Sequence, residues 1–270
     1  QPTLTKLVDV LDRFHVRFHL TGGLTSVVYG EPRMTQGVDL VLDHDQVLAV
    51  REEDADNPEL HNRWLVNGET LHGLQQMAPD RRREPTTYYG RQSGVGIAIE
   101  QYRRGRPLRI GAIGLGIGTI ACYGKEGDEI DFFEINPDVI RLARSHFTFL
   151  DDCPSRLRIL QGDARLSLEK MDQSREYDIM VLDAFSSDAI PVHLLTAEAM
   201  QLYERHLKPG GVIAVHVSNR HLRLVPVVTK LASHGEFQFA MIRRARSSRQ
   251  ERCQFGIVGH GRNQCFCRTR

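Results

Sequence analysis

The 270-residue sequence has no apolar run close to the roughly 20 residues that a membrane-spanning helix needs. Its start also lacks the basic segment followed by an apolar stretch that marks a secretory signal. The five cysteines are odd in number and mostly far apart, which fits neither a zinc site nor a disulfide framework. We therefore expect a reduced, cytoplasmic protein that holds no metal.

The composition that is present is ordinary for a folded protein, with 41% hydrophobic and 26% charged residues. The net charge of +1 is unevenly distributed, because residues 243–270 carry eight arginines and one acid. The remaining residues, 1–242, are therefore acidic overall. An acidic main body favours a cationic substrate over a nucleic acid. We interpret the basic end as solvated or disordered, the alternative being contact with a polyanion through Phe255 and Phe266.

Strand-like and helix-like segments alternate from Leu108 to about Ile242, the pattern of a parallel sheet covered by helices. The predicted strands are Leu108–Ile113, Glu129–Glu134, Leu157–Leu160, Tyr177–Leu182 and Val212–Val217. We expect Pro209-Gly210-Gly211 to form the turn before the last strand, and Pro137 to open a helix. The fold class is therefore α/β, of the Rossmann-like kind.

Changes in composition and sequence pattern divide the chain into four parts. Residues 1–45 precede a small β-domain, 46–104, with strand-like runs at Val47–Val50 and Trp64–Val66. The Rossmann-like domain covers 105–242. The basic tail, 243–270, contains one strand-like run, Gln254–Val258.

A glycine-rich loop follows the first strand of the Rossmann-like domain. Gly114, Gly116 and Gly118 stand where a backbone lets a ligand approach, before an expected helix. Glu134 ends the next strand, where an acid can accept hydrogen bonds from both ribose hydroxyls. With Asp163 after the third strand, this set favours a nucleoside-type cofactor over a structural turn. Asp163 is also a candidate helix N-cap, and both roles can hold at once.

Several motifs follow one another in the order seen in spermidine synthases. They are Leu71-His-Gly-Leu-Gln75, Thr87-Tyr-Tyr-Gly90, the glycine loop, Phe133-Glu-Ile-Asn136, Gln161-Gly-Asp-Ala164, Tyr177-Asp-Ile-Met-Val-Leu-Asp183 and Leu207-Lys-Pro-Gly-Gly211. From about Gln46 to Ile242 the chain resembles the bacterial spermidine synthase-like branch, often fused to a transporter-like membrane region. The resemblance implies a methyltransferase-type Rossmann-like fold with a small N-terminal β-domain.

The resemblance also implies a reaction, aminopropyl transfer from decarboxylated S-adenosylmethionine to putrescine or a similar amine. Glu134 would hold the ribose and Asp163 the adenine, and the three loop glycines and Gln75 would complete the cofactor site. Tyr88 and Tyr89 would line the amine pocket.

The attacking amine must lose a proton before it can act as a nucleophile. By the resemblance Asp183 is the proton acceptor; the alternative is a strand-end acid that caps the next loop. Asp188 could bind the far ammonium of a diamine. The expected partner is thus a small amine, with no membrane or nucleic acid, and a homodimer stays open.

Departures from the family pattern keep other functions open. Ile117 replaces an acid that meets the amino end of the cofactor, so intact S-adenosylmethionine, and hence a methyltransferase, is an alternative. Asp183 and Asp188 are five apart rather than three, and Ala189 replaces a proline. A non-catalytic remnant of the family is a third interpretation. We take His193, His216 and His221 as polar core or surface groups.

The two ends of the chain carry weaker patterns. One face of a predicted helix bears Leu4, Leu7, Val8 and Leu11. From Gly22 to Asp39 the sequence resembles the opening of a nucleotidyltransferase-like domain, but such domains need two carboxylates for magnesium and Gly37-Val38-Asp39 supplies one. We interpret it as vestigial, the alternative being a helix–strand unit. After Ile242, where the family continues into a closing strand pair, only Gln254–Val258 resembles a strand, and a missing partner would leave an exposed edge.

Overall fold

The structure, a computed structural model, describes residues 18–22, 38–42, 48–67, 70–184, 191–218, 222–235, 237–243 and 254–259. The chain forms two compact units, Gln1–Val47 and Leu48–Arg270. In the first, β1 (Phe18–Gly22) pairs antiparallel with β2 (Val38–Leu42). The helix predicted around Leu4–Leu11 lies outside the described residues, and the nucleotidyltransferase-like resemblance stays a prediction.

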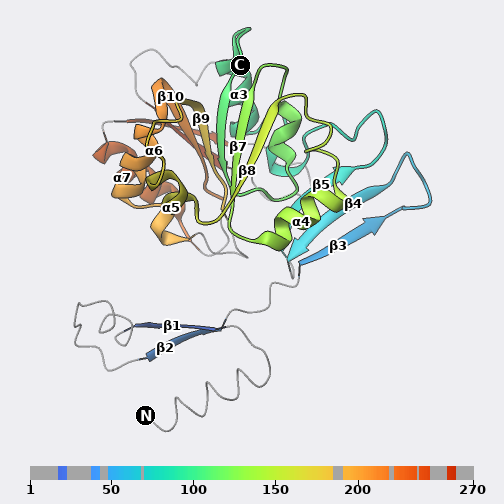
Figure 1. Cartoon of the computed structure of the whole chain (residues 1–270), viewed down its shortest axis with the longest axis horizontal. Helices are drawn as coiled ribbons and strands as arrows, with labels where there is room; N and C mark the ends of the chain where they lie inside the picture. The colour runs from blue at the N-terminus through green and yellow to red at the C-terminus, as the bar shows by residue number, and fades with distance from the viewer. Residues whose placement is uncertain are drawn as a thin grey trace. The chain divides into compact units, whose positions relative to one another are not determined.

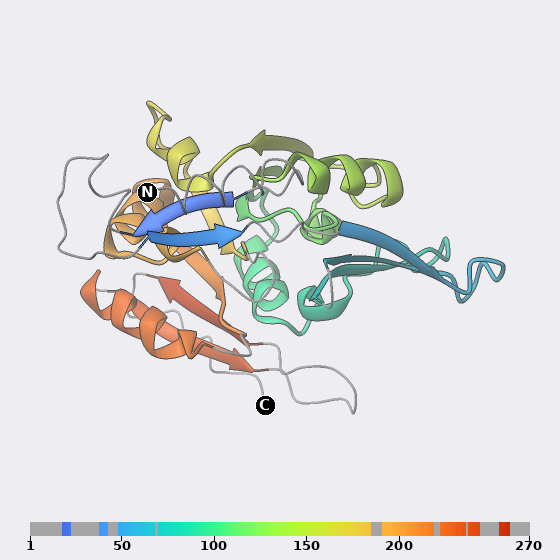
Figure 2. The same ribbon diagram turned by 90° about the horizontal axis from the view of Figure 1, so that it is seen from below.

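The second unit begins with a three-stranded antiparallel sheet of β3 (Leu48–Glu53), β4 (Asn62–Asn67) and β5 (Thr70–Gln76). β4 contains the predicted run Trp64–Val66, and β3 covers the run Val47–Val50 from Leu48 onward, Val47 lying outside the described residues. β3 contacts helix α4 (Pro137–His146), and the sheet extends away from the rest of the unit beside that helix (Figures 1 and 2). The predicted domain boundaries at residues 45, 104 and 242 stay predictions.

The main sheet has seven strands in the order β11-β12-β10-β9-β6-β7-β8 (Figure 1). Their bounds are β6 Arg109–Ile113, β7 Glu129–Glu134, β8 Arg156–Gln161, β9 Tyr177–Leu182, β10 Leu207–His216, β11 Gln238–Arg243 and β12 Gln254–Gly259. Strands β10, β9, β6, β7 and β8 are parallel, and β12 runs antiparallel to both of its neighbours. This mostly parallel sheet confirms the predicted Rossmann-like α/β class.

Helices cover both faces of the sheet. One face packs against α3 (Gly94–Arg103), η2 (Thr119–Tyr123) and α4; the other packs against α5 (Ala164–Glu169), α6 (Ala197–Arg205) and α7 (Leu224–His234). Side chains alternate between the two faces, so Phe132 enters the first core and Phe133 the second. Two short 3-10 helices, η1 (Thr87–Tyr89) and η3 (Val192–Leu194), complete the fold.

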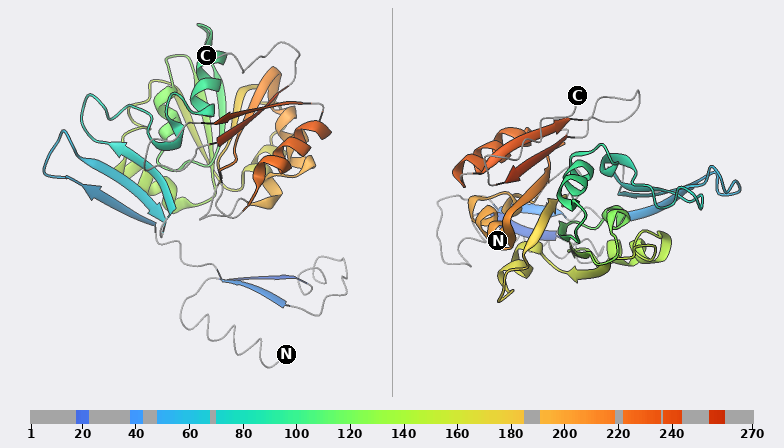
Figure 3. Two further views of the ribbon diagram at one scale, coloured as in Figure 1. Left: turned by 180° about the vertical axis from the view of Figure 1, so that it is seen from behind. Right: turned by 90° about the horizontal axis from the view of Figure 1, so that it is seen from above.

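The closing strand pair is complete, because the predicted strand-like run Gln254–Val258 forms β12 and β11 pairs with it. β12 lies between β10 and β11, and Figure 3 shows the last two strands, in red, side by side. Phe255, Ile257 and Val258 are at most 1% exposed, so these residues complete both cores. The sheet edge predicted to be exposed is therefore paired, and Phe255 is not available to stack on a polyanion.

Two local expectations were also wrong. Pro209-Gly210-Gly211 is not a turn before the last parallel strand but lies inside β10, which pairs with β9 again from Val212 after an irregularity in register. Gly210 takes a φ of 79°, so the chain bulges without leaving the sheet. After the glycine loop the expected helix is the five-residue 3-10 helix η2. Within the described residues, the helices are too short or too polar to cross a bilayer.

Candidate functional site

The carboxyl ends of β6, β7 and β9 meet at the glycine loop. Gly114 has a φ of 98°, and a Cβ there would lie 2.3 Å from the carbonyl oxygen of Asp183. The loop is held by hydrogen bonds of 2.9 Å from the Gly114 N–H to the Phe133 oxygen and from the Asp183 N–H to the Ile113 oxygen. Gly116 and Gly118 also take positive φ values, 54° and 82°. The loop brings Glu134 and Asp183 to one edge of the sheet.

Glu134, the last residue of β7, is 9% exposed. Its two oxygens accept hydrogen bonds from the Leu115 N–H at 3.0 Å and the Asn136 N–H at 2.9 Å. Burial raises the pKa of Glu134 above its ordinary value, although these backbone N–H groups oppose the shift. Each carboxylate oxygen keeps a further lone pair, so the group can accept from two hydroxyls.

Asp163 precedes α5 and is its N-cap, with the Leu166 N–H donating to Oδ1 at 2.9 Å. The other oxygen lies 2.7 Å from Nε2 of His193. Burial alone would raise the pKa of Asp163, but the Leu166 N–H and His193 outweigh it and hold the pKa below its ordinary value. The capping alternative is confirmed, and a role toward adenine stays a prediction.

Apolar side chains are exposed beside these two acids. Ile135, which follows Glu134, is 67% exposed; Leu166 on α5 and Val192 before His193 are 54% and 77% exposed. No sequence pattern singles them out, because hydropathy alone places such residues in a core. Exposed apolar groups next to hydrogen-bonding carboxylates are suited to the faces of a planar base.

Asp183 follows β9 and its side chain is 6% exposed. The Tyr89 hydroxyl donates to one carboxylate oxygen, and Nδ1 of His216 lies 2.6 Å from the other. The His216 ring stacks between Tyr88 and Phe255, with ring centroids 4.9 Å apart on each side. Three elements far apart in the chain, η1, β10 and β12, therefore fix the orientation of Asp183. Sequence reasoning missed the contact with His216.

Strand β5 lies across this site. Nε2 of His72 is buried and has no hydrogen-bond partner among the described residues. Burial lowers the pKa of His72, and the charge of Asp183 opposes the shift. The neighbouring Gly73 faces Ile117, since a Cβ on this glycine would lie 2.6 Å from Ile117 Cγ1. Ile117 is 1% exposed, so it packs beneath β5 and does not line an open cavity.

Gln75 and Asp188 complete the predicted set. Gln75 is fully buried, and its amide nitrogen donates to the Arg82 carbonyl oxygen and to the Thr148 hydroxyl, both at 2.8 Å. Its oxygen accepts from the Thr148 N–H at 3.0 Å. These contacts tie β5 to two loops, and binding of a cofactor by Gln75 stays a prediction. Asp188 lies outside the described residues, as does His221.

Searches against known proteins find relatives in two groups of transferases, while no family model matches the chain. Over 116 residues the chain is 34% identical to a polyamine aminopropyltransferase of Vibrio vulnificus, covering 41% of this chain and 38% of that protein. Over 108 residues it is 34% identical to the N-terminal histidine N-methyltransferase of Emericella nidulans, covering 38% and 19%. The chain thus spans less than half the length of these curated relatives.

Solved structures share the fold. A probable spermidine synthase from Corynebacterium glutamicum superimposes with a TM-score of 0.61 at 19% identity, covering 79% of this chain and 77% of that one. Human methyltransferase-like protein 13, in complex with SAH, gives a TM-score of 0.50 at 22% identity, covering 62% and 81%. The chain therefore has the methyltransferase-type fold and is homologous, over part of its length, to transferases that include polyamine aminopropyltransferases.

Proposed function

We propose that this protein transfers an aminopropyl group from decarboxylated S-adenosylmethionine to putrescine or a similar amine, with Asp183 as the general base. The observation that carries the proposal is the setting of Asp183. It is a nearly buried carboxylate at the carboxyl end of a central strand, held by Tyr89 and His216 beside the glycine loop. Ligands of open α/β sheets bind at this edge.

The chemistry needs a proton acceptor at that point. The amine nitrogen forms a bond to the carbon next to the sulfonium, the carbon–sulfur bond breaks, and the thioether nucleoside leaves. The proton released from the nitrogen passes to a carboxylate oxygen of Asp183. Tyr89 and His216 use one lone pair on each of these oxygens, so each retains another for the amine.

The donor would bind across the ends of β7 and β8. Glu134 is preorganised by two backbone N–H groups to accept from both ribose hydroxyls. Asp163 would accept from the adenine, whose faces fit the exposed Ile135 and Leu166. The buried Nε2 of His72 gives the amine pocket a further polar contact.

A methyltransferase is the second candidate, and the observation that favours it is Ile117. Its apolar side chain packs against Gly73, in the loop where the spermidine synthase pattern has an acid. No charge at this position would repel the carboxylate of intact S-adenosylmethionine. The Emericella nidulans relative is named as a methyltransferase.

Calorimetric titration with the two donors separates these functions. Preferential binding of decarboxylated S-adenosylmethionine, followed by formation of spermidine from putrescine, would support aminopropyl transfer. Preferential binding of the intact donor would move the methyltransferase to first place. A folded protein that binds neither would contradict both proposals and leave a non-catalytic remnant.

A further inference from the structure

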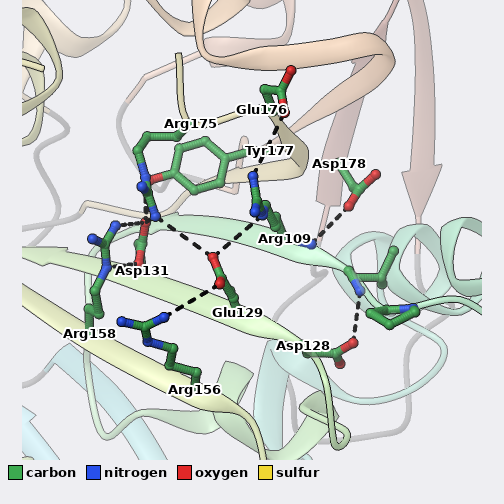
Figure 4. Close-up of polar contacts among 12 residues, drawn as sticks. Arg109, Asp128, Glu129, Asp131, Arg156, Arg158, Arg175, Glu176, Tyr177 and Asp178 are labelled. Carbon is green, nitrogen blue, oxygen red and sulfur yellow. Dashed lines mark hydrogen bonds and ion pairs between the residues drawn. The ribbon is translucent and has the colours of Figure 1, made fainter. Parts of the chain in front are cut away.

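A cavity of about 170 Å³ lies at the amino ends of the central strands, a strand length from Glu134 and Asp183. We name it the arginine hollow, and Figure 4 shows most of its polar contacts. It is lined by Arg109, Glu129, Asp131, Arg156, Arg158 and Arg175. Along β7, about 17 Å of strand separates Glu129 in the hollow from Glu134, and about 10 Å separates Asp131 from Glu134.

Strand register brings these residues together. Arg109, Glu129 and Arg156 are the first residues of β6, β7 and β8, and they face one another across the three strands. Asp131 faces Arg158 in the same manner two residues further on. Because side chains alternate along a strand, Glu129 and Asp131 lie on the same face of β7.

Asp131, the inner carboxylate of the hollow, is hydrogen bonded by several neighbouring side chains. Asp131 is 2% exposed and receives two hydrogen bonds from Arg158, at 2.6 and 2.5 Å, and one from the Tyr177 hydroxyl at 2.7 Å. Arg175 adds a contact at 3.2 Å. These contacts of Asp131 are explained by the stability of the fold, because a buried carboxylate needs such partners.

Glu129, the outer carboxylate of the hollow, has more cationic neighbours than its single charge can balance. Arg109, Arg156 and Arg175 all approach Glu129, at ion-pair distances of 3.4, 3.8 and 3.8 Å. These distances exceed the roughly 2.7–2.9 Å of a charge-assisted hydrogen bond. Half-exposed pairs of this kind contribute only about 0–1 kcal/mol each to stability. Hydrogen bonds to the buried Asp131, at 3.2 and 3.3 Å, account for the position of Arg175, but folding does not explain why Arg109 and Arg156 also approach Glu129.

We propose that the arginine hollow binds a phosphate group, with Arg109, Arg156 and Arg175 as its ligands. Four guanidinium groups face two carboxylates among the lining residues, which leaves two positive charges for a doubly charged anion. The planar fork of arginine matches the tetrahedral oxygens of phosphate. Glu129 occupies part of the same space, so it competes with the anion and limits its affinity. Glu176, 60% exposed and 3.7 Å from Arg109, adds a weaker repulsion at the rim.

Calorimetric titration with inorganic phosphate at low ionic strength tests the proposal. We expect saturable binding of one equivalent to the wild-type chain. Arg156 is 76% exposed, so R156Q should stay folded while binding at least about tenfold more weakly. E129Q removes the competing charge and should bind about tenfold more tightly.

The matched control is R141Q. Arg141 is 63% exposed and pairs with Asp138 within α4, so its loss changes the net charge equally. It should leave phosphate binding within twofold of wild type. Glycerol 3-phosphate, as a second probe, distinguishes a phosphate ester from the free anion, and saturable binding of either supports the proposal. Absence of saturable binding to both wild type and E129Q, or equal weakening in R156Q and R141Q, would overturn it. None of these outcomes depends on the proposed transferase activity.

Discussion

Asp131 and Glu134 lie three residues apart on the same strand, both buried, and they behave in opposite ways. Arginines surround Asp131 at the amino edge of the sheet, and the hydrogen bonds from Arg158 and Tyr177 outweigh burial and lower its pKa. Glu134, at the carboxyl edge, is hydrogen bonded to backbone N–H groups, and burial raises its pKa. Burial alone therefore does not distinguish the two acids.

The difference shows where a carboxylate is available to a ligand. The acceptor sites of Asp131 are taken by cationic side chains and a tyrosine hydroxyl. Glu134 is oriented by the backbone, but its charge has no cationic partner among the residues that the structure describes. Retaining an ionised group in that state opposes stability. Hydroxyl donors from a ligand would relieve this cost.

The largest expected effect concerns Asp183, which shares the carboxyl edge with Glu134. D183N removes the proton acceptor, so turnover of the amine should fall by about a thousandfold. Nucleoside binding should change by less than about threefold, because Asp183 is not one of the proposed nucleoside ligands. D138N, on the exposed face of α4, is the matched control and should keep full activity. Undiminished turnover in D183N would refute its role as base.

The next largest effect concerns Asp131 at the amino edge of the sheet, where we expect a substitution to lower the stability of the fold. D131N leaves Arg158 and Arg175 without their buried carboxylate, so the free energy of unfolding should fall by about 3 kcal/mol. Urea denaturation at pH 7 measures this change. Nucleoside affinity of the folded D131N protein should equal that of wild type. A loss of affinity would mean that the two edges are coupled.

E134Q should show the reverse combination. Losing charge-assisted bonds to two ribose hydroxyls should weaken nucleoside binding by about a hundredfold, as calorimetry would show. The free energy of unfolding should change by no more than about 1 kcal/mol, because relief of the buried charge offsets the loss of one backbone hydrogen bond. A large loss of stability with unchanged binding would exchange the roles that we assign to Asp131 and Glu134.

The pH dependence of stability should have opposite signs at the two residues. The pKa of Asp131 is lowered on folding, so its contribution is present above about pH 3.9 and is lost as the pH falls through the lowered pKa. The pKa of Glu134 is raised, so its contribution is present below about pH 4.3 and is lost as the pH rises through the raised pKa.

Urea denaturation of wild type, D131N and E134Q across this range measures both trends. The difference in unfolding free energy between wild type and D131N should shrink by about 1–2 kcal/mol as the pH is lowered below 4. The stability of wild type relative to E134Q should increase as the pH falls through the raised pKa of Glu134 and should level off below about pH 4.3. Parallel trends for the two variants would contradict the comparison.

The sequence predicted the central strands closely, because buried apolar runs such as Tyr177–Leu182 stand between polar segments. The same local reading failed at Pro209-Gly210-Gly211, where pairing with β9 keeps the chain in the sheet despite its turn-forming residues. It found the strand-like run Gln254–Val258 of β12 but not its place in the sheet. Insertion between β10 and β11 is a long-range pairing that a basic local composition conceals.

The candidate site was predicted in part for the same reason. Motifs identified Glu134, Asp163 and Asp183, whose places at strand ends follow from chain order. The contacts of Asp183 with Tyr89 and His216 join residues 94 and 33 positions away, so no local pattern reveals them. The packing of Ile117 under Gly73 likewise depends on how β5 folds back over the glycine loop.

The most direct test of the account is a calorimetric titration of wild type, E134Q and D131N with 5′-methylthioadenosine. This thioether nucleoside is the product of the proposed reaction and carries both ribose hydroxyls. We expect equal affinity for wild type and folded D131N and about a hundredfold weaker binding for E134Q. Equal binding by wild type and E134Q would contradict the assignment of the carboxyl edge as the nucleoside site.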